Sequence, residues 1–401
     1  MSSIGGGFSI GATFSLGGGK GSGLKLTSVN VGTQQTVGHL PRDYMMPRDN
    51  TSQLLGMAAS TATSMAVGWL FRKFVTKKGA FNAKDLILDG LHGFQSGAGS
   101  MRGRVARSFY TGGLFGGPLN VINHRVDPTL DPRITSLTLG LLNVVRNEVG
   151  YGLVPCQGFR RDPTTGEVSL RTGQLIVNST LDVAETALYY YVGDVLSGLA
   201  QGKRGTALKK MGRVGAAYGA AAGLLTNLAL GAPVRIEKER IEAGRQLVLR
   251  NGGNDLKGIA EHATWRMGGL AQLMASNWGI TLPGTRPNIW MGTGVAADAT
   301  TVPHESSHLM DALDQGTESF YCRDGRDWWK VKNSGDNWWK TPGYGRSIST
   351  EGEAYHSTDP QPNDPVYNGD PMYIGDVMAN SINMGVQALM SWLMARKPRV
   401  P

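Results

Sequence analysis

Residues 300–313 of this 401-residue chain read Thr300-Thr301-Val302-Pro303-His304-Glu305-Ser306-Ser307-His308-Leu309-Met310-Asp311-Ala312-Leu313, which contains an H-E-x-x-H pattern. The apolar side chains that follow the second histidine recur at helical spacing, so this stretch is predicted to form an α-helix. Thr300 or Thr301 is suited to cap the N-terminus of the helix. Pro303 is suited to its first position, where a missing N–H costs nothing. On such a helix, His304 and His308 lie one turn apart on the same face.

Two imidazoles at this spacing can bind one metal ion, and the ion that the pattern indicates is Zn²⁺. Glu305 would then lie beside the ion and act as the general base, taking a proton from metal-activated water and passing it to a leaving amine. A catalytic zinc has three protein ligands, so one more must come from elsewhere. Residues 351–356 read Glu-Gly-Glu-Ala-Tyr-His and supply two carboxylates and a histidine. The alternatives closer to the helix are Asp311, Asp314 and Glu318.

The pattern resembles the active-site helix of the zincin superfamily of zinc metallopeptidases. The chain around it resembles bacterial secreted effectors or toxins of that type, and the resemblance covers roughly the last third of the chain. In zincins whose third ligand is a glutamate on a later helix, that residue lies in an E-x-E-A context. The resemblance therefore implies that Glu353 completes the zinc site, with Glu351 as its rival. It also implies that Tyr355 or His356 serves as an oxyanion donor or as a partner of the ligands.

A second zincin subfamily, the aspzincins, places an aspartate ligand in a G-T-x-D-x-x-Y-G motif. Residues 316–322 of this chain read Gly-Thr-Glu-Ser-Phe-Tyr-Cys, so the aspartate and the second glycine of that motif are missing. The glutamate-type site is therefore favoured over the aspzincin type.

Length and composition predict an α+β protein, mainly helical, with two or three domains. The net charge of +9 is unevenly distributed: residues 1–130 carry 13 basic and 5 acidic side chains, whereas residues 301–401 carry 9 and 13. We expect a flexible Gly-rich region at 1–50, a helical or mixed N-terminal domain at 51–250, and a zincin-like metallopeptidase domain at 251–401. No sequence motif indicates specific nucleic-acid binding.

The first 50 residues do not resemble a secretory signal peptide, because no basic residue precedes Lys20 and glycine and serine dilute the apolar positions. Because the resemblance implies a secreted protein, the expected route is export from the cytoplasm that does not depend on a signal peptide, and delivery into a target cell is one form that this export could take. Cys156 and Cys322 are the only cysteines and provide neither a disulfide framework nor a C-x-x-C metal site.

Two uncharged stretches, 51–71 and 214–234, are long enough to cross a membrane. Because small and polar residues are frequent in both, a buried helix packed through small residues is the favoured interpretation. Contact with a membrane is the alternative.

Several further elements are predicted from local pattern. Residues 160–168 have the turn chemistry of a hairpin, and a helix is expected over 181–199, with Tyr189, Tyr190 and Tyr191 packing in a core. Two helices are expected over 234–250 and 255–277, the second lying behind the active-site helix. Residues 288–291 are predicted to form a strand at the edge of the cleft, where an extended peptide would pair.

Two segments lie outside this scheme. Residues 325–330 and 335–340 form a near-repeat, Gly-Arg-Asp-Trp-Trp-Lys and Gly-Asp-Asn-Trp-Trp-Lys, which predicts a hairpin with four tryptophans. These side chains would line a substrate wall, stack on carbohydrate, or form a hydrophobic cluster. Residues 374–395 predict an amphipathic C-terminal helix.

The sequence thus predicts a zinc-dependent metallopeptidase that acts on a protein, a peptide or the peptide part of peptidoglycan. The alternative is a structural, secretion-associated or tail-associated protein whose zincin-like domain is inactive or whose zinc is structural.

Overall fold

The computed structural model describes residues 8–16, 24–33, 50–74, 82–149, 155–282, 284–296, 298–318, 320–321, 324–325 and 349–360. These residues are mainly helical, with a few short strands, as expected for a mainly helical α+β protein. The tryptophan repeat beyond Gly325 and the predicted C-terminal helix at 374–395 lie outside the described residues.

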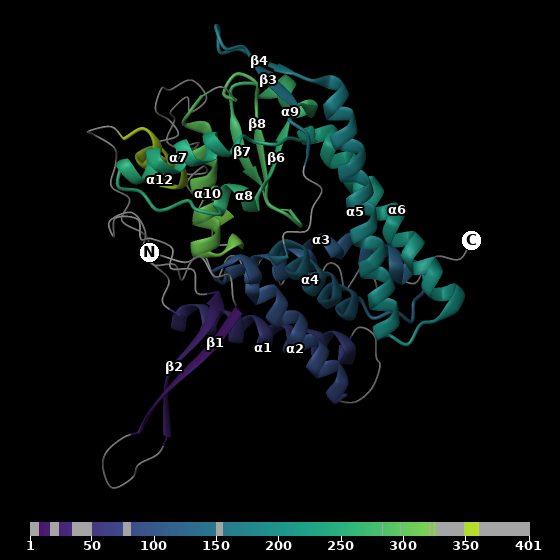
Figure 1. Ribbon diagram of the computed structural model, residues 1–401. Coiled ribbons are helices and arrows are strands. Elements are labelled where there is room, and N and C mark those ends of the chain that lie inside the picture. Colours follow the sequence, from purple (N-terminus) through teal and green to yellow (C-terminus); the bar gives the residue numbers. More distant parts are fainter. Residues whose placement is uncertain are drawn as a thin grey trace, which may run out of the picture.

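Six long helices within residues 50–230 form three antiparallel hairpins (Figure 1). Their bounds are α1 (Asn50–Phe74) with α2 (Ala83–Gly97), α3 (Arg104–Val126) with α4 (Pro132–Glu148), and α5 (Thr172–Ala200) with α6 (Gly205–Leu230). A short 3-10 helix, η1 (Ala98–Ser100), links the first hairpin to the second. Helices α1 to α4 occupy the lower part of Figure 1, and α5 and α6 run side by side along its right.

Glycine allows the backbones within each hairpin to approach closely. A methyl group at Gly93 of α2 would lie 2.8 Å from the Ser60 carbonyl oxygen of α1. A methyl group at Gly112 of α3 would lie 2.6 Å from the Leu139 carbonyl oxygen of α4. A methyl group at Gly215 of α6 would lie 2.3 Å from the Tyr190 carbonyl oxygen of α5. Any larger residue at these positions would separate the helices.

A four-stranded sheet lies beside the helical hairpins, in the order β5-β6-β8-β7. The strands are β5 (Ala232–Pro233), β6 (Thr264–Met267), β7 (Gly279–Leu282) and β8 (Asn288–Met291). Strands β6 and β8 are parallel, whereas β5 and β7 pair antiparallel with their neighbours. Strand β7 is therefore an edge strand, and β8 lies inside the sheet.

Four helices surround this sheet: α7 (Lys238–Arg250), α8 (Ile259–His262), α9 (Gly269–Met274) and α10 (Thr301–Gln315). Helix α12 (Ser349–Thr358) packs against α10 and α7 (Figure 1). The main hydrophobic core joins α7 and α10 to the sheet through side chains that include Val248, Trp265, Ile289, Leu309 and Leu313. Helix α10 is thus fixed on several sides.

Two ribbons of strands complete the described structure. Strands β3 (Phe159–Arg161) and β4 (Val168–Leu170) pair antiparallel, as predicted from the turn residues between them. In the Gly-rich N-terminal region, β1 (Phe8–Leu16) pairs with β2 (Leu24–Thr33), and the ribbon projects away from the rest of the molecule in Figure 1. The sequence pattern did not predict this ribbon.

Other predictions can be checked against these elements. The helices expected at 181–199 and 234–250 correspond to α5 and α7, and Tyr189 and Tyr190 are buried while Tyr191 is exposed. The helix expected at 255–277 is wrong, because α8, β6 and α9 occupy that segment. Gly268, between β6 and α9, and Gly269, the first residue of α9, are both at positive φ. The strand at 288–291 exists, but its predicted place at the cleft edge is wrong, because β7 is the edge strand.

The uncharged stretch at 51–71 does form a helix, but the expectation that it is buried is wrong. Only 6% of the most apolar window of α1 is buried. The second stretch, 214–234, runs through most of α6 into β5, and Leu224, Leu225 and Leu228 on it are more than half exposed.

Candidate metal centre

The helix α10 carries the H-E-x-x-H residues and begins two residues earlier than predicted, at Thr301. No side-chain cap from Thr300 is formed. Instead, the Asp298 carboxylate accepts hydrogen bonds from the backbone and the hydroxyl of Thr300, at 2.9 and 2.8 Å. Pro303 lies within the first turn, where its missing N–H is not needed.

Close packing fixes the position of α10. The side chain of Pro303 lies against Gly244 of α7, where a methyl group would approach within 2.9 Å. Ser306, at a position where an apolar residue is common in zincins, is buried, and its hydroxyl donates to the Val302 carbonyl at 2.7 Å. Leu309 and Leu313 are buried in the core on the far face. The histidine face therefore has a fixed orientation.

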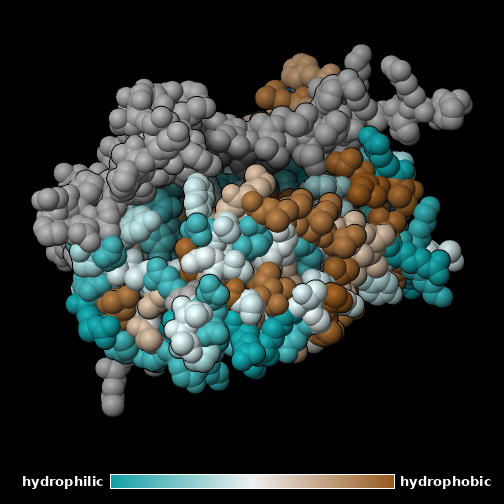
Figure 2. Space-filling model, turned by 90° about the horizontal axis from the view of Figure 1, so that it is seen from above, coloured by the Kyte–Doolittle hydropathy of each residue, from teal (hydrophilic) through white to brown (hydrophobic). Residues whose placement is uncertain are grey.

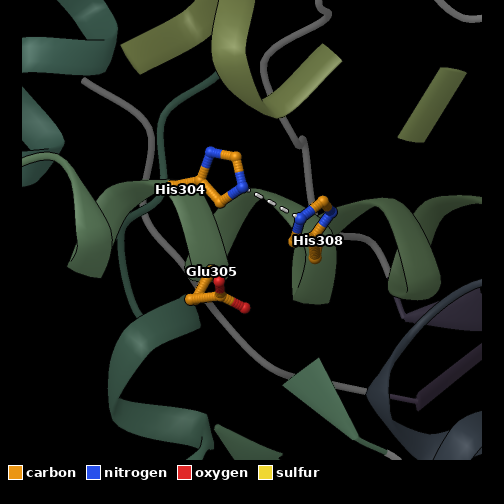
Figure 3. Close-up of side chains that lie close together, drawn as sticks. All are labelled: His304, Glu305 and His308. Carbon is orange, nitrogen blue, oxygen red and sulfur yellow. Dashed lines mark hydrogen bonds between the residues drawn. The ribbon is translucent and has the colours of Figure 1, made fainter. Parts of the chain in front are cut away.

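The two histidines meet as the sequence predicted. Their Nε2 atoms are 3.2 Å apart, and Figure 3 shows the rings adjoining, with Glu305 arising from the same turn of α10. The Glu351 carboxylate of α12 contacts both rings. Its Oε2 lies 3.2 Å from Nε2 of His304, and its Oε1 lies 3.5 Å from Nε2 of His308.

These distances fit a tetrahedral metal ion. Two ligand atoms bound to Zn²⁺ at the usual length of about 2.0–2.1 Å lie about 3.3 Å from each other. The Nε2 atoms of His304 and His308 are 3.2 Å apart, and they lie 3.2 and 3.5 Å from Oε2 and Oε1 of the Glu351 carboxylate, respectively. Two imidazole nitrogens and one carboxylate are also a donor set that zinc prefers. The residues present therefore fit the ion that the sequence pattern implies.

Glu305 is near the same point but is held by different partners. Potential ligand atoms of His304, Glu305 and His308 all lie within 4.8 Å of one another. The Glu305 carboxylate accepts a hydrogen bond from the Thr281 hydroxyl at 2.8 Å, and the same hydroxyl lies 3.1 Å from the Glu305 carbonyl oxygen. Strand β7 thus positions Glu305, whereas Glu351 is the carboxylate closer to the ring nitrogens.

Gly279 on β7 provides the space that Glu305 occupies. A methyl group at Gly279 would lie 2.2 Å from Oε1 of Glu305 and 2.7 Å from its Cδ. The Tyr321 hydroxyl donates to the Thr281 carbonyl at 3.3 Å, which supports β7 from the other side. Sequence reasoning missed Gly279, Thr281 and Tyr321. No local motif marks them, because their relation to Glu305 exists only once β7 has packed on α10.

Charge is strongly coupled in this cluster. Burial acts to lower the pKa of His308, but the adjacent Glu351 carboxylate outweighs burial and raises it to about 10. Burial acts in the opposite sense on Glu351, and the two histidines nevertheless hold its pKa well below the usual range. Burial raises the pKa of Glu305, and the histidines only partly oppose this. The contact between them thus favours the charged forms of both His308 and Glu351.

Tyr355 lies on the same face of α12 as Glu351, because the two are four residues apart. Its ring centroid is 4.6 Å from that of His304, with the planes at 62°. The structure thus brings Tyr355 to the site, as the sequence predicted.

The nearer alternatives for a third ligand point elsewhere. Asp311 lines a small cavity with Asn254, Ser307 and Ser357. Glu318 packs on the helical hairpins, where its carboxyl carbon would lie 2.8 Å from a methyl group at Gly99. Within the described part of the chain, the group of potential metal ligands consists of His304, Glu305 and His308, so Asp311, Asp314, Glu318 and Glu351 all lie outside it. Glu351 is distinguished from the other three by its contacts with both histidine rings.

Glu353, the residue favoured from the sequence, belongs to the backbone of α12, but its side chain lies outside the described residues. Its role as a ligand stays a prediction. The structure does show that Glu351, the rival, contacts both histidines.

The site has an open side. The side chains of His304, His308 and Glu351 are 12%, 6% and 29% exposed, so the carboxylate is the most accessible part of the cluster.

Comparison of the chain with protein-family models, curated proteins and solved structures found no match.

Proposed function

We propose that this protein is a zinc metallopeptidase whose zinc ligands are His304, His308 and Glu351. The observation that carries the proposal is the three-way contact between these side chains, with separations of 3.2, 3.2 and 3.5 Å. Glu351 replaces Glu353 as the favoured third ligand because residues two apart on a helix face different sides, so only one of them can face α10.

Bound zinc would supply a Lewis acid that polarises the scissile carbonyl and lowers the pKa of water. Glu305 is the general base, because its carboxylate lies beside both histidines and is oriented by Thr281. Its burial raises its pKa, which makes it a better proton acceptor than an exposed glutamate. Glu305 takes the proton from the attacking water and delivers it to the amine that leaves.

Tyr355 is proposed to donate a hydrogen bond to the oxyanion. Its ring packs edge-on against His304, which restricts its motion and directs the residue toward the site. A phenol in that place stabilises negative charge that develops on the substrate oxygen.

The proposed substrate is an extended peptide. Strand β7 is the edge strand next to α10, and it carries Thr281, the residue that orients the general base. A peptide that pairs with an edge strand is held extended by main-chain hydrogen bonds. Because Tyr321 already donates to the Thr281 carbonyl, such pairing would use the part of β7 that precedes it. The secreted-effector class and export without a signal peptide remain predictions from the sequence.

The experiment is to replace Glu305 with Gln and to measure both bound zinc and hydrolysis of unfolded casein and of peptidoglycan. The substitution keeps the size of the side chain and leaves the histidines in place. Zinc content should therefore be unchanged while hydrolysis falls by roughly 10²–10⁴-fold. Glu261→Gln, an exposed glutamate on α8, is the matched control and should retain activity.

An unchanged rate in Glu305→Gln would remove the general base from the proposal. A wild-type protein that binds zinc but hydrolyses neither substrate class would favour the alternative, in which the metal is structural and the chain has a binding or assembly role.

A further inference from the structure

The six long helices α1 to α6 have an unusual distribution of side chains: many polar residues are buried beside a small apolar core, and many large apolar residues are exposed. Asn143 and Asp194 are fully buried, and each makes a hydrogen bond to another helix. The Asn143 amide donates to the Ser108 carbonyl at 2.7 Å, and Asp194 accepts from the Asn123 amide at 2.8 Å. The Gln95 amide likewise donates to the Ser136 carbonyl at 2.9 Å. Soluble helical bundles normally bury leucine at such positions.

The outward faces are apolar on all three hairpins. Leu224, Leu225 and Leu228 of α6 are 62%, 64% and 56% exposed, and Leu55 of α1 and Leu141 of α4 are each 61% exposed. Figure 2 shows brown, hydrophobic residues gathered on the side of the molecule where α5 and α6 lie. Helix α1 is also long and apolar enough to cross a membrane.

Helices in lipid typically have glycine where their backbones meet, polar residues between them and leucine on their outer faces. There, close backbone packing and interhelical hydrogen bonds hold the helices together, and the apolar side chains face the acyl chains. In water, apolar surface distributed in this way remains unburied, which marks an interaction surface.

The three hairpin tips meet at one end of the region. Arg133, at the start of α4, bonds to Asp85 and Asp89 of α2, at 2.7 and 2.6 Å. Lys203, between α5 and α6, bonds to Asp127 just after α3, at 2.5 Å. These ion pairs join α2 to the start of α4, and the segment between α3 and α4 to the segment between α5 and α6, and they neutralise acidic side chains at this end.

Among the described residues at this end, several exposed side chains are basic. Arg204, Lys209, Lys210 and Arg213 are exposed around the start of α6. Lys73, near the end of α1, is exposed, and its ammonium lies over the rings of Trp69 and Phe74, at 4.7 and 5.3 Å. A lysine beside aromatic rings at the end of an apolar helix is typical of a membrane interface.

We infer that residues 50–230 form a lipid-binding module that engages an anionic bilayer, with its apolar hairpin faces in contact with acyl chains and its basic tips on acidic headgroups. Charge favours a bilayer over a second copy packed in the same direction, because such a copy would bring like-charged tips together, whereas anionic lipid attracts them. The inference rests on the hairpins alone and does not depend on the metal centre.

The test is flotation of the full chain with vesicles of phosphatidylcholine alone and of phosphatidylcholine with phosphatidylglycerol. The protein should float with the anionic vesicles and bind the neutral ones at least tenfold more weakly, with a strong dependence on salt. The variant Lys209→Gln, Lys210→Gln, Arg213→Gln should lose roughly a hundredfold in partitioning, at about fivefold per charge.

The matched control makes the same change in net charge elsewhere. Lys238→Gln, Arg250→Gln, Lys257→Gln alters three exposed basic residues in and after α7 and should bind vesicles like the wild type. A second variant, with Leu224, Leu225 and Leu228 each changed to Gln, should lose at least tenfold in partitioning. It should keep its helical circular dichroism, because these side chains are exposed. Zinc content should be the same in every variant.

Two results would overturn the inference. One is a wild-type protein that fails to float with anionic vesicles. The other combines two observations. The wild type self-associates in lipid-free solution, measured by light scattering, and the leucine variant does not, while the wild type and the leucine variant bind lipid equally. That result would show that a second copy covers the apolar faces.

Discussion

Substitution of Gly279 by Ala tests the placement of Glu305 without touching a proposed ligand. The added methyl group would lie 2.2 Å from Oε1, 2.7 Å from Cδ and 2.9 Å from Cγ of Glu305. Ordinary contact requires more than about 3 Å, so the carboxylate must move by about 1 Å. The atoms that must move are the end of a flexible side chain, so the fold should yield there without unfolding. A displacement of that size at a catalytic group costs on the order of 10²-fold in rate.

The assay is kcat/KM on unfolded casein, with zinc content and circular dichroism measured on the same samples. Gly279→Ala should lose roughly a hundredfold in kcat/KM while keeping its zinc and its fold. Gly173→Ala is the control, because a methyl group there meets no atom within 4 Å. If Gly279→Ala hydrolyses casein at the wild-type rate, Glu305 is not the base in the position described, and the reasoning from β7 fails.

Three further predictions concern Thr281, His308 and the ion pair between Asp182 of α5 and Arg266 of β6. Thr281→Val removes the hydroxyl that orients the general base, and should lower kcat/KM by about 10–100-fold with zinc retained; an unchanged rate would make that hydrogen bond incidental. Glu351 raises the pKa of His308 to about 10, so a zinc ion must displace a proton from this ring when it binds. Zinc affinity measured by chelator competition should therefore rise about tenfold per pH unit from pH 7 to 9. A zinc affinity that does not change with pH would contradict the ion pair. Asp182→Ala leaves the buried Arg266 without its 2.8 Å partner and should cost about 3–5 kcal/mol in the free energy of unfolding, measured with urea.

The helix that carries the site could be predicted from the sequence because all of its signals are local. The spacing of His304 and His308 and the apolar residues after them follow from one helical period, and α10 confirms it. The β3–β4 hairpin was likewise predictable, since its turn residues are contiguous.

Features made by packing between distant segments could not be predicted. A helix over 255–277 satisfied the apolar spacing, but short apolar runs do not distinguish a helix from a strand such as β6. The proximity of Gly279 to Glu305 depends on β7 being the edge strand, which sheet order alone decides.

The choice between Glu351 and Glu353 as the third ligand also depends on packing between distant segments. Glu351 and Glu353 have almost the same local sequence context, and only the rotation of α12 relative to α10 decides which carboxylate faces the histidines. The exposure of α1 could not be predicted either. An uncharged stretch with many small residues is compatible with a buried helix and with an exposed helix such as α1.

The central claim is that His304, His308 and Glu351 bind a catalytic zinc ion, and the most direct test compares zinc affinity in Glu351→Gln and Glu353→Gln by chelator competition. The two variants make the same chemical change on the same helix, so an effect on folding or net charge cancels. Glu351→Gln should bind zinc more than about 100-fold more weakly than the wild type, beyond the 10–100-fold loss expected for an outer partner, while Glu353→Gln should bind it normally. Normal zinc affinity in Glu351→Gln, with loss in Glu353→Gln, would contradict the ligand set and return the third position to the residue favoured from the sequence.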